Sequence, residues 1–485
     1  MITSLYQSLC NMETNIADRV ALRWYDEEKQ GVAEVHYAQY AQDLRRFVAF
    51  LRAEYGDVRG KRVAILARNS YQYVICMYGT VIAGGVAVPL NLGKDWDAIS
   101  YELGLTEPVC ILQDGEFAER EPALAETYGS ILKPMDVFAA YEPAEDVTEV
   151  EDLSALAFIM FTSGTTGRSK GVMLSQKNLF SAMPAFLDPF DDVKKYTGWN
   201  TDEFSSLSAL PMFHISAMTS LVSWSITGHS INLCNNLKYF YRDLGAMHSE
   251  VMAVVPVLLK SIYSDVMKGR RDRLNGLCML TCGAAMFDPK MLSDMMEKGF
   301  FVAQMYGLTE TCGDGIINYE QDEKHIRAVG KPDDHAEYKL DETGEICIRG
   351  GCVMLGYYKD PEATAEVLDA DGWFHTGDLA RVDEDGFYYI TGRKKNIIIL
   401  DNGENVSPEE LENLLSKCEA VKECIVREKG KKICAVIYCG EADQQTVRDF
   451  ITETNRTLPL YKRMSAVEFS TEPLPRTGTG KLLRK

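Results

Sequence analysis

The segment that most constrains the fold of this chain is Thr162-Ser163-Gly164-Thr165-Thr166-Gly167-Arg168-Ser169-Lys170-Gly171. The apolar run 155–161 before it is typical of a buried strand, so we expect a loop at the end of a sheet strand, where ligands often bind. The glycines let backbone N–H groups approach an anion, the hydroxyls add donors, and Lys170 adds positive charge. The spacing is not that of the usual P-loop, which has four residues between its glycine and its Gly-Lys pair. We predict a phosphate-binding loop of another type, because a solvated Ser/Gly linker would need no buried strand before it.

The composition is that of a globular protein with a length typical of about three domains. The 485 residues are 46% hydrophobic and 25% charged. With 71 acidic and 51 basic residues the net charge is −20, which argues against nucleic acid or an anionic membrane surface as a partner. The 13 cysteines include no Cys-x-x-Cys pair and no Cys/His spacing typical of a metal site. They fit a reducing compartment, and we predict neither disulfides nor a zinc site.

The N-terminus lacks the basic and apolar segments of a signal peptide, so a cytoplasmic location is expected. One uncharged stretch, residues 69–93, is long enough to cross a bilayer. Gly84, Gly85 and Pro89 interrupt it, however. We therefore predict a buried helix over 71–83 followed by a strand over 86–90, and no transmembrane segment.

Apolar runs alternate with helix-like segments through most of the chain, as in an α/β fold. Strands are predicted at 61–66, 86–90, 109–112, 158–161, 206–210, 230–234, 252–255, 277–281 and 301–304. Short strands with turn residues follow around 330–392, including a hairpin of 378–382 with 387–391. We predict a large N-terminal domain, 1–392, of two stacked α/β subdomains plus a small β unit. A small α+β C-terminal domain, 393–485, should contain a helix with Ser407 at the N-cap, Pro408 at the first position and Glu410 completing a capping box.

Eight further motifs follow the loop. They are Leu210-Pro211-Met212-Phe213-His214, Gly283-Ala284-Ala285, Tyr306-Gly307-Leu308-Thr309-Glu310, Gly344-Glu345-Ile346, Trp373-Phe374-His375-Thr376-Gly377-Asp378-Leu379, Gly392-Arg393-Lys394-Lys395, Gly403-Glu404-Asn405-Val406 and Pro475-Arg476-Thr477-Gly478-Thr479-Gly480-Lys481. In this order, and over essentially the full length, the chain resembles the adenylate-forming (AMP-binding) superfamily, most closely its acyl-CoA synthetases or acid–CoA ligases. The resemblance implies an enzyme that converts a carboxylic acid and ATP to acyl-AMP and pyrophosphate, and then transfers the acyl group to the thiol of CoA.

The resemblance also implies ATP, Mg²⁺ and CoA as ligands. Glu310 matches the family's Mg²⁺ carboxylate, Tyr306 the ring that stacks on adenine, and Asp378 the acceptor of both ribose hydroxyls, with Arg393 reaching the same sugar. Gly403 matches the glycine that pantetheine passes. The full set of implied nucleotide- and cofactor-binding residues is Thr162, Ser163, Gly164, Thr165, Thr166, Gly167, Lys170, Gly283, Ala284, Ala285, Tyr306, Gly307, Thr309, Asp378, Arg393 and Gly403.

Three residues match catalytic positions of the family: Lys481, His214 and Glu310. Lys481 follows Gly478-Thr479-Gly480 and carries its charge on a flexible side chain. This suits a residue that bridges the incoming carboxylate and the α-phosphate. His214 resembles the aromatic gate between the acyl and thiol tunnels. Lys395 matches the hinge of a mobile C-terminal domain that swings after adenylation.

The acid is expected to carry no ammonium group. The stretch 204–237 contains no Asp, Glu, Lys or Arg, so a buried α-ammonium would find no partner charge. A fatty or aryl acid is therefore favoured. Candidate wall residues of its pocket are Ala209, His214, Met218, Trp224, Cys282 and Met305.

Two other functions stay open on the sequence. A stand-alone activating enzyme would load the acyl group onto a carrier protein instead of CoA. A nucleotide-binding regulator without activity would not need Glu310, Asp378, Arg393 and Lys481 together. The sequence indicates neither the chain length of the acid nor the oligomeric state.

Overall fold

The computed structural model describes residues 2–162, 168–283, 287–332, 334–400, 404–430, 432–476 and 482–483. The chain divides into two compact units. Unit 1 comprises Met1–Glu337 and Ile348–Phe374, and unit 2 comprises Tyr338–Cys347 and His375–Lys485. Residue 392, where the sequence suggests a domain boundary, falls inside unit 2. Unit 2 thus contains the strand that carries Asp378 as well as residues 393–485, whereas the division into domains 1–392 and 393–485 stays a prediction.

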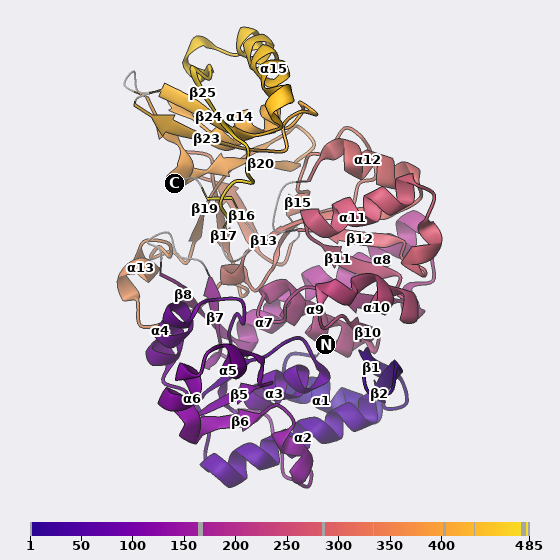
Figure 1. Ribbon diagram of the computed structural model, residues 1–485. Helices are drawn as coiled ribbons and strands as arrows, with labels where there is room; N and C mark the ends of the chain where they lie inside the picture. Colours follow the sequence, from indigo (N-terminus) through magenta and orange to yellow (C-terminus); the bar gives the residue numbers. More distant parts are fainter. Residues whose placement is uncertain are drawn as a thin grey trace. The chain divides into compact units, whose positions relative to one another are not determined.

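The first sheet of unit 1 has seven strands in the order β18-β8-β7-β4-β3-β5-β6. Figure 1 labels β5, β6, β7 and β8 of this sheet. They are β3 (Arg62–Leu66), β4 (Val86–Pro89), β5 (Cys110–Gln113), β6 (Leu132–Pro134), β7 (Leu156–Thr162), β8 (Lys170–Ser175) and β18 (Gly356–Tyr357). The five strands from β6 to β7 are parallel, whereas β8 and β18 are added antiparallel. The helices of this part of the chain are α2 (Tyr37–Tyr55), α3 (Tyr71–Ile82), α4 (Trp96–Thr106), α5 (Glu116–Arg120) and α6 (Ala123–Tyr128).

The second sheet of unit 1 has nine strands in the order β15-β14-β13-β12-β11-β9-β10-β1-β2. They are β1 (Val20–Asp26), β2 (Gly31–His36), β9 (Ser205–Ser208), β10 (Ser230–Leu233), β11 (Val251–Val254), β12 (Met279–Cys282), β13 (Phe301–Gly307), β14 (Gly315–Asn318) and β15 (Lys331–Pro332). The six strands from β13 to β1 are parallel. The accompanying helices are α7 (Gln176–Ala182), α8 (Pro184–Thr197), α9 (Ile215–Thr227), α10 (Phe240–Ala246), α11 (Pro256–Met267) and α12 (Pro289–Glu297).

One hydrophobic core joins the two sheets of unit 1. It contains Leu9 of α1 (Leu5–Thr14), Phe47 of α2, Met77 of α3 and Val222 of α9, each fully buried. Helices that are apolar on more than one side pack between layers in this way. The prediction of two stacked α/β subdomains is confirmed.

The uncharged stretch 69–93 folds as predicted, as helix α3 followed by strand β4. Ser70 begins the helix, because its hydroxyl accepts a hydrogen bond from the backbone N–H of Tyr73. Gly84, with φ of 87°, ends the segment in a conformation that favours glycine, and β4 starts at Val86. Across the described ranges, no helix has both the length and the apolar character needed to span a membrane.

Unit 2 contains most of a four-stranded sheet, β16-β17-β19-β20, a two-stranded sheet and a three-stranded sheet. The strands are β16 (Glu337–Leu340), β17 (Glu345–Arg349), β19 (Phe374–Val382), β20 (Tyr388–Arg393), β21 (Ile398–Ile399), β22 (Asn405–Val406), β23 (Glu423–Lys429), β24 (Lys432–Tyr438) and β25 (Ala466–Ser470). Helices α14 (Pro408–Leu415) and α15 (Gln444–Thr457) complete the α+β character. The predicted hairpin is β19–β20, and in its turn the Asp383 carboxylate accepts from the backbone N–H groups of Asp385 and Phe387.

Two local predictions need correction. The strand predicted at 206–210 ends at Ser208, because the Asn69 side chain bonds the Leu210 carbonyl and the Met212 N–H and draws the chain out of the sheet. Ser407 caps α14 as predicted, by accepting from the Glu410 N–H at 3.4 Å. The Glu410 carboxylate, however, accepts from Lys462 Nζ at 2.7 Å, since an ammonium is a stronger partner than a backbone N–H.

Candidate active site

The described ends of the predicted phosphate loop are two adjacent strands. Thr162 is the last residue of β7 and Lys170 the first of β8, and the two residues face each other in the antiparallel ladder. The loop thus starts and ends at one point of the first sheet. Ser163, Gly164, Thr165, Thr166 and Gly167, also predicted to bind phosphate, lie outside the described residues.

Lys94, just before helix α4, and residues of α4 contact Arg168 and Ser169, which precede Lys170. Lys94 Nζ donates to Ser169 Oγ at 3.1 Å and forms an ion pair with Glu102, whose side chain is fully buried. The Arg168 guanidinium lies 5.4 Å from the centre of the Tyr101 ring. These contacts are made by the side chains of Arg168 and Ser169, the two residues immediately before Lys170.

We expect Lys94→Ala to destabilise the fold by about 3–5 kcal/mol, because it leaves the Glu102 carboxylate buried without its counter-charge. Urea unfolding of the full chain measures this. Lys29→Ala is the matched control: Lys29 pairs with Asp26 but its side chain is 78% exposed, so its loss should cost less than about 1 kcal/mol. Equal effects of the two substitutions would show that the Lys94–Glu102 pair has no special role.

Several predicted residues lie at the carboxyl ends of neighbouring parallel strands of the second sheet. Gly283 follows the last residue of β12, and Tyr306 and Gly307 end the neighbouring strand β13. Ala284 and Ala285 lie outside the described residues. Gly307 also has a structural reason to be glycine, since a Cβ there would lie 2.4 Å from the carbonyl oxygen of Gly313.

Glu310, the predicted metal ligand, lies with Thr309 in a short 3-10 helix, Thr309–Thr311, directly after β13. Its Oε1 accepts a hydrogen bond from Tyr357 Oη at 3.0 Å. The Lys170 Nζ lies 4.7 Å from the centre of the same tyrosine ring. Tyr357 therefore connects the predicted metal carboxylate with the predicted phosphate lysine.

Tyr357 is not among the site residues predicted from the sequence. It is the last residue of β18, which pairs with β8 so that Tyr357 lies opposite Val172. Burial and the nearby Glu310 carboxylate raise the pKa of the Tyr357 phenol, so it remains a donor at neutral pH. No spacing rule identifies it, because 47 residues separate it from Glu310.

Three of the predicted acyl-pocket residues, His214, Met218 and Trp224, lie in helix α9 or at its start. His214 is its N-cap residue, and its ring centre lies 4.6 Å from that of Phe213. Met218, one turn further, is fully buried, and Ala209 and Cys282 are also buried. A Cβ on Gly313 would contact the side chains of Phe186, Ile215 and Thr219, so the chain between Glu310 and β14 runs close to α9.

Two of the residues predicted to line the acyl pocket, Trp224 and Met305, have other surroundings in the structure. Trp224 belongs to the main core, where its ring lies 5.2 Å from that of His229. Met305 is only partly buried and lies opposite Ile317 in the β13–β14 ladder. A separate cavity of about 420 Å³, lined by Trp199, Met296 and Phe300 among others, lies at the start of β13 and thus at the end remote from Tyr306.

In unit 2, Asp378 and Arg393 lie directly opposite each other in the β19–β20 ladder. Arg393 Nε lies 2.6 Å from Asp378 Oδ1, and the Asp378 side chain is 4% exposed against 39% for Arg393. Lys395 lies in the short 3-10 helix Lys394–Asn396 that follows β20. Gly403 and Lys481 lie outside the described residues.

Each unit, taken by itself, carries side chains of kinds that bind parts of a nucleotide. Unit 1 places a carboxylate, a tyrosine hydroxyl and a lysine together at the ends of sheet strands, which suits a divalent cation with phosphate oxygens. Unit 2 supplies a buried carboxylate with a paired guanidinium, whose planar groups suit a vicinal diol. The described side chains of unit 1 thus fit Mg²⁺ with phosphate, and those of unit 2 fit a ribose.

Family models match the chain in two parts. Residues 12–358 match the AMP-binding enzyme model, and residues 410–481 match the C-terminal domain model of AMP-binding enzymes. Among curated proteins, the feruloyl-CoA synthase of Amycolatopsis sp is 30% identical over 487 residues, with 94% of each chain covered. The 2-succinylbenzoate–CoA ligase of Bacillus licheniformis is 29% identical, covering 94% of this chain and 95% of the relative. The long-chain-fatty-acid–CoA ligase FadD13 of Mycobacterium tuberculosis is 28% identical, covering 92% and 91%.

Solved structures agree over nearly the whole chain. The o-succinylbenzoate CoA synthetase (MenE) of Bacillus subtilis, in complex with its acyl-adenylate intermediate, superposes with a TM-score of 0.81 at 26% identity and covers 98% of this chain and 96% of its own. ATP-bound MatB of Rhodopseudomonas palustris gives a TM-score of 0.82 at 25% identity, covering 99% and 97%. A further structure of the Bacillus subtilis enzyme contains ATP and a magnesium ion.

Proposed function

This chain belongs to the family of AMP-binding enzymes, and from that premise we propose that it is an AMP-forming acid–CoA ligase. In the first half-reaction a carboxylate oxygen attacks the α-phosphorus of ATP, and the bond to pyrophosphate breaks to give acyl-AMP. In the second, the CoA sulfur attacks the acyl carbon, the thiol proton is lost, and AMP leaves. ATP, Mg²⁺ and CoA are the ligands that this chemistry requires.

The observation that carries the proposal is the group of Glu310, Tyr357 and Lys170. We propose that Glu310 holds Mg²⁺, which would offset the negative charge of the phosphates. Tyr357 orients Glu310 through its 3.0 Å hydrogen bond, and Lys170 adds positive charge for the departing pyrophosphate. Lys481 is proposed to act at the α-phosphate. Asp378 and Arg393 are proposed to hold the ribose.

The proposed acid is fatty or aryl. Helix α9 carries no charged side chain, and its buried Met218 offers an adaptable apolar surface. The named relatives are a feruloyl-CoA, a 2-succinylbenzoate–CoA and a long-chain-fatty-acid–CoA enzyme, which is consistent with an acid without an ammonium group. A cytoplasmic location is proposed because 13 free cysteines suit a reducing compartment.

The test is a pyrophosphate-release screen over short, medium, long and aromatic acids, with and without CoA. We expect release with fatty or aryl acids, little with amino acids, and acyl-CoA only when CoA is added. Thioester formed only on the phosphopantetheine of a carrier protein would favour the alternative of a carrier-loading enzyme. No release with any acid would favour a nucleotide-binding regulator.

Tyr357→Phe is expected to slow pyrophosphate release by about 10- to 100-fold, because a hydrogen bond to a charged group contributes about 1.5–3 kcal/mol. The ring beneath Lys170 is kept, so the loss reports on Glu310, and the Mg²⁺ concentration needed for half-maximal rate should rise. Tyr358→Phe is the matched control: this neighbouring tyrosine has its ring 5.5 Å from Lys359 Nζ, which the substitution leaves in place, so activity should be close to wild type. An unchanged Mg²⁺ requirement in Tyr357→Phe would mean that the tyrosine does not orient the metal ligand.

A further inference from the structure

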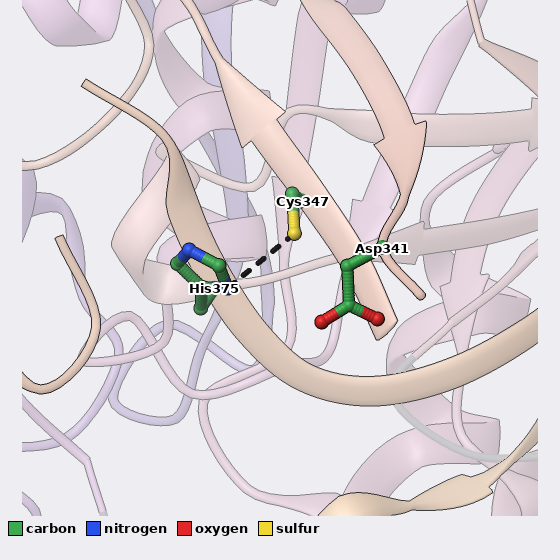
Figure 2. A group of neighbouring side chains, drawn as sticks. All are labelled: Asp341, Cys347 and His375. Atoms are coloured by element: carbon green, nitrogen blue, oxygen red, sulfur yellow. Dashed lines mark hydrogen bonds between the residues drawn. The ribbon is translucent and has the colours of Figure 1, made fainter. Parts of the chain in front are cut away.

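Three side chains that commonly bind metals converge in unit 2. Asp341 lies in the turn after β16, Cys347 in β17 and His375 in β19. Figure 2 shows the three side chains pointing toward one another from separate segments. One ligand atom from each lies within 4.8 Å of the ligand atoms of the other two.

The distance between the histidine nitrogen and the cysteine sulfur matches that of a tetrahedral site. His375 Nδ1 lies 3.5 Å from Cys347 Sγ and 3.6 Å from Glu345 Oε2. Around a tetrahedral Zn²⁺ with bonds of about 2.3 Å to sulfur and about 2.0–2.1 Å to nitrogen and oxygen, S···N would be about 3.6 Å and N···O about 3.4 Å. One ring nitrogen therefore already faces a sulfur and a carboxylate oxygen at the required spacing. Glu345 lies beside the group but is not among the three residues whose ligand atoms all lie within 4.8 Å of one another.

The side chains of this group range from partly exposed, which lets an ion enter, to fully buried, which shields a bound ion from water. The side chains of His375 and Asp341 are 33% and 24% exposed, whereas that of Glu345 is 4% exposed and Cys347 is fully buried. Thiolate, imidazole and carboxylate donors together favour Zn²⁺ or Co²⁺ over Mg²⁺, which prefers oxygen ligands.

A positive group already lies at this position. Lys394 Nζ is 2.7 Å from Glu345 Oε2 and 3.7 Å from Asp341 Oδ2. Its side chain is 48% exposed, so the ammonium has access to water if it is displaced. The carboxylates thus form a place for a cation, and a metal would compete with this lysine.

We propose that Asp341, Cys347 and His375 form a Zn²⁺ site, in which the metal displaces the Lys394 ammonium from beside Asp341 and Glu345. A metal–sulfur bond forms as the S–H bond of Cys347 breaks, and the proton passes to solvent. No zinc site was predicted from the sequence, because short Cys/His spacings are absent. Here 28 residues separate the cysteine and the histidine, and adjacent strands bring them together.

The test uses the full chain, freed of metal with a chelator and titrated with Co²⁺. We expect a Co²⁺–thiolate charge-transfer band with the visible absorption of a tetrahedral ion, both removed by one equivalent of Zn²⁺. Cys347→Ser should lose the band, and it and His375→Gln should each weaken binding by about 100-fold. Cys278→Ser, at a partly buried thiol in unit 1, is the matched control and should bind as the wild type does.

Lys394→Met separates this site from adventitious binding. Removal of the competing ammonium should tighten Co²⁺ binding by about tenfold. Circular dichroism establishes that each variant is folded. Absence of a thiolate band in the folded wild type, or an undiminished band in Cys347→Ser, would overturn the site, and unchanged affinity in Lys394→Met would overturn the displacement.

Discussion

Lys481→Ala is expected to slow pyrophosphate release from acid and ATP by about 10²- to 10³-fold, the usual effect of removing one charge-stabilising group from a transition state. The attacking carboxylate and the α-phosphate repel each other, and a lysine between them offsets that repulsion as the bond forms. Thioester formation from supplied acyl-AMP should be largely unchanged, because the adenylate bond is then already made. Single-turnover assays of the two half-reactions measure the difference.

Lys485→Ala is the matched control for Lys481→Ala, since it removes a lysine from the same C-terminal segment. It should leave both half-reactions close to wild type. If Lys481→Ala slowed both half-reactions equally, the lysine would have a general role in binding or folding, and its assignment to adenylation would fail.

Lys395→Pro is expected to have the opposite effect, with adenylation largely unchanged and thioester formation slowed by about 100-fold, as misplacement of a reacting group can cause. We propose that residues 393–485 move between the two half-reactions with a hinge near Lys395. Proline fixes φ at its own position and restricts the residue before it, so the backbone could no longer take up two conformations. The same single-turnover assays check this.

Lys395→Ala separates the charge from the backbone and should retain most of both activities. Proline at 395 also restricts Lys394, which bonds Glu345, so urea unfolding is needed to show that the fold is retained. Equal slowing of both half-reactions by Lys395→Pro, in a folded protein, would argue against a hinge at this residue.

Local patterns predicted most of the fold. The strand before the phosphate loop, the helix at 71–82 and the β19–β20 hairpin follow from apolar runs, from the Ser70 cap and from turn residues, which act over a few positions. Where long-range contacts compete, local rules fail. Strand β9 ends early because Asn69, far away in the sequence, bonds the chain beyond it.

The candidate site was predicted only in part for the same reason. Glu310, Asp378 and Arg393 stand in motifs that can be read within a few residues. Tyr357 and Lys94 stand in no such motif, and their roles arise from a hydrogen bond to Glu310 and an ion pair with buried Glu102. Such partners are selected by strand pairing and packing, which a local pattern does not contain.

The sequence by itself determined the chemistry of this protein: an apolar strand followed by a loop of glycines, hydroxyls and Lys170, and ordered motifs that end at Lys481. These are properties of residue type and spacing, and they do not depend on packing. Only the tertiary structure decided which side chains support that chemistry. The pairing of β18 with β8 brings Tyr357 to Glu310, and the pairing of β17 with β19 brings Cys347 to His375. Both depend on contacts between residues distant in the sequence, whose free energy is set by the folded chain as a whole.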